Sequence, residues 1–211
     1  GENDGVLDAS DYVLFYGEGT RKWDPFHASH HNLYSDDSFY YITYGGSAGK
    51  RVQTLTQPSG TAEVQFTDAN ERIFHEIDAV NIANLSRKWF GETFTTSFTN
   101  SYSLGLTNVV STKPAKFSGN VAGASSAESF MQVSLNGTQV GNYQIAPKGD
   151  NHKGNERYFE YEIANPTPAN QINIQFNNNG VPSARGYVDF VAIDYYKYLA
   201  GHNKQFKFNF A

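Results

Sequence analysis

The stretch Leu135-Asn136-Gly137-Thr138 decides the fold class, because it combines a turn signal with strand-like residues on both sides. An Asn-Gly pair readily takes the positive φ angles that a two-residue hairpin turn requires. Apolar side chains alternate with other residues before and after the pair, and Val140 and Tyr143 then have opposite parity. The stretch therefore predicts an antiparallel β-hairpin with a β-bulge near Gly141.

Alternation of apolar and polar residues predicts further strands with one solvent-facing side. The segment from Gly186 to Leu199 differs, because both of its sides are apolar, which predicts a central strand. Two aromatic segments, Tyr12 to Tyr16 and Phe39 to Tyr44, are interpreted as strands as well. The apolar sets of the alternating segments are Ala62, Val64 and Phe66, then Phe159, Tyr161 and Ile163, then Ile172, Ile174 and Phe176.

One helix is expected, from Asp78 as the N-cap to Gly91 as the stop, although it lacks a strong periodic stripe. Turns in the second half recur every roughly 8–15 residues, which suits an antiparallel sandwich. We therefore expect a mainly β protein: a jelly-roll-like β-sandwich preceded by a smaller β-rich region, with one short helix. The expected divisions are a lead region (1–85), the sandwich (86–200) and an exit segment toward a downstream domain (201–211).

Composition narrows the function classes. The 211 residues carry a net charge of −5 with no basic run, so nucleic acid is not an expected partner. The absence of cysteine excludes a thiol nucleophile, a disulfide framework and a cysteine-ligated zinc site. Aromatic residues make up 15% of the chain and charged residues only 18%, which is typical of a secreted or surface-exposed β protein. An extracytoplasmic location is expected.

The acidic N-terminal run matches most of a twelve-residue calcium loop when Gly5 is set at the sharp turn. Leu7 then fills the apolar position, and only the first ligand position falls before the chain. Calcium is the cofactor that this pattern suggests, and the alternative is an acidic, solvated lead into the first strand. The expected ligands are Glu2, Asp4, Val6, Asp8 and Asp11.

Histidines form a second cluster at His27, His30 and His31. Their spacing matches no defined zinc or copper pattern, so a polar loop is the favoured interpretation over a metal site. His75 alternates with Ile73 and Ile77 and is expected to face the sheet with a hydrogen-bond partner.

Trp23 and Trp89 are the candidate ligand-binding residues, because indole rings offer flat stacking faces for sugars or peptides. The competing interpretation places such aromatics in the core or in cross-strand pairs. No Gly-x-Ser-x-Gly elbow and no phosphate-binding glycine loop occurs, so a freestanding hydrolase is the least favoured function class.

Several stretches, in matching order over nearly the whole chain, resemble one family. The stretches are similar to the region upstream of the peptidase domain in gingipain-like, PorU-type sortases of the type IX secretion system of Bacteroidetes. The stretches are Asp11 to Gly19 with Trp23, Asn32 to Asp36, Phe39 to Thr43, His75 to Asp78 with Asn81, Arg87 to Glu92, and Gly186 to Tyr196.

The resemblance implies a parent protein on the outer-membrane surface or secreted. Members of the family are cysteine peptidases that remove C-terminal secretion signals from cargo and join the cargo to a surface lipopolysaccharide. Because this chain has no cysteine, the catalytic residues would lie beyond Ala211 and this segment is not expected to be an enzyme. It would position the downstream peptidase domain and contact cargo or other surface-complex proteins. The alternative is a carbohydrate-binding or adhesin-like module with a glycan partner.

Overall fold

The computed structural model describes most of the chain between residues 9 and 200. The chain divides into two compact units, Gly1–Pro58 and Ser59–Ala211. Within the described part, no helix has the length and apolarity of a membrane span. The described residues are 9, 12–13, 15–25, 28–32, 34–43, 45, 56, 59–61, 65–82, 88–95, 98–150 and 153–200, so the expected exit segment 201–211 lies outside them.

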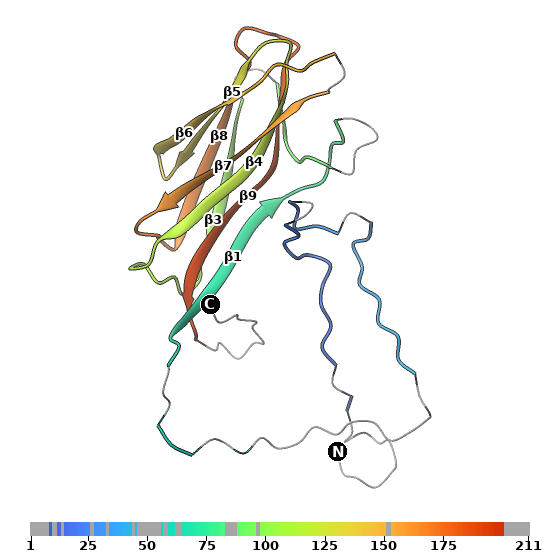
Figure 1. Cartoon of the computed structure of the whole chain (residues 1–211), viewed down its shortest axis with the longest axis vertical. Helices are drawn as coiled ribbons and strands as arrows, with labels where there is room; N and C mark the ends of the chain where they lie inside the picture. The colour runs from blue at the N-terminus through green and yellow to red at the C-terminus, as the bar shows by residue number, and fades with distance from the viewer. Residues whose placement is uncertain are drawn as a thin grey trace. The chain divides into compact units, whose positions relative to one another are not determined.

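The second unit is a sandwich of two antiparallel sheets, as the sequence predicts (Figure 1). One sheet has the strand order β1-β9-β4-β7, with β2 also paired to β9, and the other has the order β3-β8-β5-β6. The strands are β1 Asp68–Glu76, β2 Thr93–Phe94, β3 Thr99–Gly105, β4 Ala115–Ala124, β5 Ser129–Leu135, β6 Thr138–Ile145, β7 Asn155–Ile163, β8 Ala169–Asn177 and β9 Arg185–Tyr198. β1 lies within the stretch 1–85 that the sequence assigned to the lead region, and it is part of this sandwich.

The hairpin predicted around Asn136-Gly137 joins β5 to β6. Both turn residues have positive φ, 50° and 82°, as a two-residue turn of this kind requires. Val133 pairs with Gly141 and the next residue pairs with Gln139, so Val140 is left over as the bulge expected near Gly141. The Asn136 side chain also accepts a hydrogen bond from the Gln171 amide at 2.8 Å, which anchors the turn to β8.

The core lies between the two sheets and follows the predicted alternation. On β8, Ile172, Ile174 and Phe176 are completely buried, and each stabilises the fold by roughly 1.5–3 kcal/mol through its burial. β9 pairs with β1, β2 and β4, which confirms its predicted central place. On β7, Phe159 and Ile163 are buried as expected, but Tyr161, the third member of that predicted set, is 37% exposed.

The predicted helix is wrong where the structure describes it. Val80 and Phe90 form an antiparallel bridge, with N–O distances of 2.7 and 2.8 Å in the two directions. One continuous helix cannot hold this pair, because helical hydrogen bonds join residues four apart. The segment instead packs Phe90 against Tyr187 and Ala122, a long-range contact that the weak helical periodicity did not reveal.

Three predicted strands also differ. The described residues of Tyr12 to Tyr16 and of Phe39 to Tyr44 are not in strands, and their large apolar side chains are exposed. The described part of the first unit has only the isolated bridge between Asp24 and Ser29 instead of a β-rich region. Of the predicted inward set Ala62, Val64 and Phe66, the first two lie outside the described residues, and Phe66 is 51% exposed. Alternation is only half of a strand signal, because a strand also needs a partner to satisfy its backbone groups.

Candidate functional site

A short hairpin in the first unit positions Trp23. Its backbone closes through the bridge between Asp24 and Ser29 and through a hydrogen bond of 2.8 Å from the Lys22 amide to the His30 carbonyl. The reversal includes Ala28 at a φ of 49°, in the left-handed region. The Trp23 and His30 rings lie 4.7 Å apart between centroids and are tilted by 45°.

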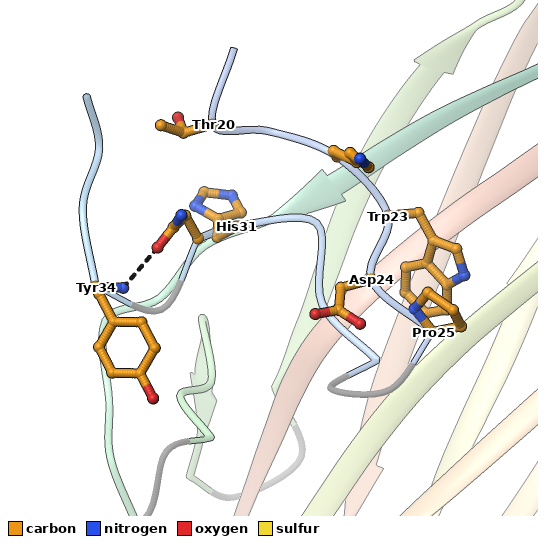
Figure 2. Close-up of a pocket in the computed structure, with 8 residues that line it drawn as sticks. Thr20, Trp23, Asp24, Pro25, His31 and Tyr34 are labelled. Carbon is orange, nitrogen blue, oxygen red and sulfur yellow. Dashed lines mark hydrogen bonds between the residues drawn. The ribbon is translucent and has the colours of Figure 1, made fainter. Parts of the chain in front are cut away.

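Next to this hairpin is a pocket with a volume of about 340 Å³ (Figure 2). The Trp23 indole and the Tyr34 phenol supply its aromatic surface, and Tyr34 is 77% exposed. A carboxylate, an ammonium group, a carboxamide and a hydroxyl complete the lining. The lining residues are Thr20, Lys22, Trp23, Asp24, Pro25, His31, Asn32 and Tyr34.

A turn within the lining segment fixes the side chain of Asn32 in this pocket. The Asn32 side-chain oxygen accepts a hydrogen bond from the Tyr34 amide at 2.9 Å, drawn as a dashed line in Figure 2. The His31 Nε2 atom is buried and has no hydrogen-bond partner among the described residues. An aromatic plane surrounded by mixed donors and acceptors is suited to a sugar or a short peptide.

The candidate metal ligands of the sequence are the N-terminal acidic run and, as the less favoured interpretation, the histidine cluster. His30 is buried beside Trp23, His31 lines the pocket, and His27 lies outside the described residues. Within the residues that the structure describes, no three His, Asp or Glu side chains are grouped as metal ligands. The expected calcium ligands Glu2, Asp4, Val6, Asp8 and Asp11 all lie outside the described residues.

Trp89 is found on the second unit, in the segment that precedes β2, and is 42% exposed. The structure does not place it in the pocket of Trp23. Its neighbour Lys88 bridges two carboxylates, with Nζ 2.7 Å from Glu156 and 3.1 Å from Asp189. Trp89 is therefore an exposed indole next to an anchored ion-pair cluster.

Asp189 is the buried centre of this cluster, with 2% of its surface exposed. The side chain of Asn120 donates hydrogen bonds of 2.9 Å to both Asp189 and Glu156. Burial raises the pKa of Asp189 to about 6, although Lys88 and Asn120 act in the opposite direction. Burial alone would lower the pKa of Lys88, but the facing carboxylates outweigh it and raise that pKa. The sequence carries a signal for this cluster, an aspartate inside an apolar strand, but the partners of that aspartate lie far away along the chain.

His75 has the hydrogen-bond partner that its alternation predicted. Its Nε2 atom lies 2.8 Å from Glu92, and its ring lies 4.9 Å from the ring of Tyr102 on the facing sheet. Burial acts to raise the pKa of Glu92, but the hydrogen bond from His75 and the Glu92 backbone amide lower it overall. Burial, with the nearby Glu92 charge, raises the pKa of Tyr102. This group joins β1, the residue that precedes β2, and β3, and so connects the two sheets.

Comparison with known proteins shows a likeness in fold. No family model and no curated protein matches the chain. Among solved structures, dimeric latent PorU from Porphyromonas gingivalis matches 66% of this chain at 15% identity, with a TM-score of 0.52. The shared feature is the fold. The match spans only 14% of the PorU chain.

Two carbohydrate-binding modules are also similar, at a coarser level. A family 36 module in complex with calcium and xylotriose matches 61% of this chain and 99% of its own, at 14% identity and a TM-score of 0.35. A family 35 module from Clostridium thermocellum matches 60% of this chain and 90% of its own, at 13% identity and a TM-score of 0.36.

Proposed function

We propose that this chain is a noncatalytic β module of a gingipain-like, PorU-type peptidase that is secreted or held on the outer-membrane surface. It positions the peptidase domain of the parent chain and contacts cargo or other surface proteins. The observation that carries the proposal is the PorU-like sandwich over about two thirds of a chain that contains no cysteine. A thiol peptidase needs its thiolate and histidine together, so the reaction belongs to another part of the parent.

The arrangement of the ionisable groups supports this role. Asp189 is paired with Lys88 and hydrogen-bonded by Asn120. His75 is engaged with Glu92, and both groups lie where they connect strands. Pairs of this kind fix the geometry of the strands that they connect, and a buried carboxylate is tolerated only when it is paired or hydrogen-bonded.

The experiment uses a fluorogenic peptide that carries a C-terminal secretion signal. The full-length parent should cleave it, and purified residues 1–211 should leave it intact at the same molar concentration. Cleavage by residues 1–211 alone would contradict the proposal directly. The full-length parent with its predicted nucleophile replaced serves as the matched blank.

A second candidate function is a carbohydrate-binding or adhesin-like module. The pocket beside Trp23 favours it, since an accessible indole with polar neighbours suits a sugar ring, and Trp89 is exposed as well. On a glycan array, Trp23→Ala should remove the signal if this pocket binds the sugar, with Trp89→Ala tested in parallel. An array without signal for the unmodified chain rules this candidate out.

Calcium binding is proposed only for the acidic N-terminal run. Its carboxylates at Glu2, Asp4, Asp8 and Asp11 are oxygen ligands of the kind that calcium prefers, and the backbone of Val6 supplies a further oxygen. Binding there would stabilise the folded state of the chain.

A further inference from the structure

The four-stranded sheet contains no charged residue. Its strands β3, β5, β6 and β8, of 7, 7, 8 and 9 residues, have no Asp, Glu, Lys or Arg. At the chain's overall 18% charged residues, strands of this combined length would carry about five. Every charged residue of the sandwich strands lies in the other sheet, on β1, β4, β7 and β9. The two outer faces of the sandwich therefore differ in chemistry.

Amides and hydroxyls form continuous rows across the outer face of the four-stranded sheet. In one row, Thr99, Gln175, Gln132 and Asn142 are register neighbours across all four strands. The edge members are exposed and Gln132 is half-buried. Because strands in a sheet lie about 4.8 Å apart, such a row spans roughly 14 Å.

The hydrogen bonds within this face leave side-chain amide donors without a partner among the described residues. The Ser101 hydroxyl donates to the side-chain oxygen of Asn173 at 2.6 Å, and the Ser103 hydroxyl donates to that of Gln171 at 2.9 Å. The side-chain amide nitrogens of Asn173 and Gln171 have no partner within the described residues, so these donors are open to a ligand. The serines also fix the orientation of both amide groups.

We propose that this outer face of the β3-β8-β5-β6 sheet binds an uncharged polysaccharide chain. Sugar hydroxyls both donate and accept, and carboxamides and hydroxyls match them in both roles. A face without charges complements a ligand without charges, because no ion has to lose its hydration when the two surfaces meet. The half-buried Phe130, on the outward side of β5, adds an apolar ring for the sugar face. The site shares no residue with the pocket of Trp23. The inference rests on the second proposed function, a carbohydrate-binding module, and deepens it by naming a neutral polysaccharide as the ligand.

The test replaces the two oriented amides by their carboxylate isosteres, Asn173→Asp together with Gln171→Glu. Each change keeps the oxygen that accepts from serine and replaces the unpaired NH₂ donor by a charged acceptor. The matched control is Asn70→Asp together with Gln65→Glu, which adds the same charge at exposed positions that lie outside this face. Thermal unfolding of both variants checks that the fold is retained.

The probes are soluble neutral glucan, mannan, xylan and galactan, with polygalacturonate as a charged comparison, measured by affinity electrophoresis and calorimetry. We expect at least one neutral polymer to bind and polygalacturonate not to bind. The Asn173→Asp, Gln171→Glu variant should lose affinity by about tenfold or more, since two hydrogen bonds are lost and two charges are desolvated. The control variant and Trp23→Ala should bind as the unmodified chain does.

Three results would overturn the inference. The first is that none of the four neutral polymers binds, and the second is that the isosteric variant binds as well as the unmodified chain. The third is binding that Trp23→Ala removes and the sheet variant leaves intact, which assigns the sugar to the first unit. Self-association of the chain that the sheet variant abolishes, without any polysaccharide binding, would make this face a protein interface instead.

Discussion

The side chain of Asn120 donates a hydrogen bond to Asp189 at 2.9 Å, at the one place where β4 and β9 change register. Asn120 pairs with Phe190 and the next residue pairs with Val188, so Asp189 is the extra residue of a β-bulge. A bulge redirects side chains, which lets Val188 and Val191 both reach the core while Asp189 turns to Lys88. The bulge and the ion pair are thus one structural feature.

Removing Lys88 should expose the cost of that buried carboxylate. Lys88→Ala leaves Asp189 without its cation, and we expect a loss of about 2–4 kcal/mol in the free energy of unfolding near neutral pH. Lys116→Ala is the matched control, because Lys116 pairs with Glu160 at an exposed site and such pairs contribute about 0–1 kcal/mol. Urea unfolding of the two variants measures the difference, and equal losses would show that Lys88 does not stabilise the cluster.

The raised pKa of Asp189 predicts how stability depends on pH. Its pKa is about 6 in the folded chain, against the ordinary value of 3.8 that applies once the chain unfolds. The folded state therefore binds this proton more tightly, so its stabilising contribution is complete below about pH 3.8 and is lost as the pH rises through 6. The Asp189→Asn variant cannot titrate at this position. Its free energy of unfolding should therefore rise by about 2–3 kcal/mol relative to that of the unmodified chain as the pH increases from 4 to 7. Parallel stability curves for the two proteins would refute the assignment.

Gly186 marks a position where the core tolerates no side chain. A Cβ atom there would lie 2.6 Å from Met131 and 2.6 Å from Phe176, both fully buried. Gly186→Ala should therefore destabilise the sandwich by about 1–3 kcal/mol through overpacking. Gly105→Ala is the control, since its nearest neighbour would be 4.0 Å away, and it should be neutral. Unfolding midpoints that do not separate the two variants would contradict the packing described for β9.

Calcium should raise the melting temperature of the parent chain if the N-terminal run binds it, because a ligand that binds only the folded state stabilises that state. Asp8→Asn should reduce the shift by removing one oxygen charge from the loop. Magnesium at the same concentration is the control. A melting temperature that stays constant at millimolar calcium would exclude the loop assignment.

Local chemistry explains which parts of the fold were predictable. The Asn136-Gly137 turn, its bulge and the buried face of β8 depend on residues close in sequence, so the sequence alone predicts them. β9 was recognisable because a strand covered on both faces is apolar on both. In each case the residues that form the structural feature are the same neighbouring residues whose pattern predicts it.

The remaining features depend on partners far apart in the chain. Phe90, at the end of the predicted helix, packs against Tyr187 and Ala122, and the buried Asp189 pairs with a lysine about a hundred residues earlier. Of the candidate site residues, Trp23 lines a pocket of the first unit and Trp89 is exposed on the second, and neither the pocket nor the exposure could be predicted from the sequence. The uncharged sheet face emerges only when four separate strands are placed side by side.

Reading the parent gene past the codon for Ala211 tests the central claim most directly. The account predicts an open reading frame that continues into a peptidase domain with a cysteine and a histidine arranged for thiol catalysis. A frame that stops there, or that continues into a domain without such a pair, would contradict the proposal that this sandwich serves a cysteine peptidase.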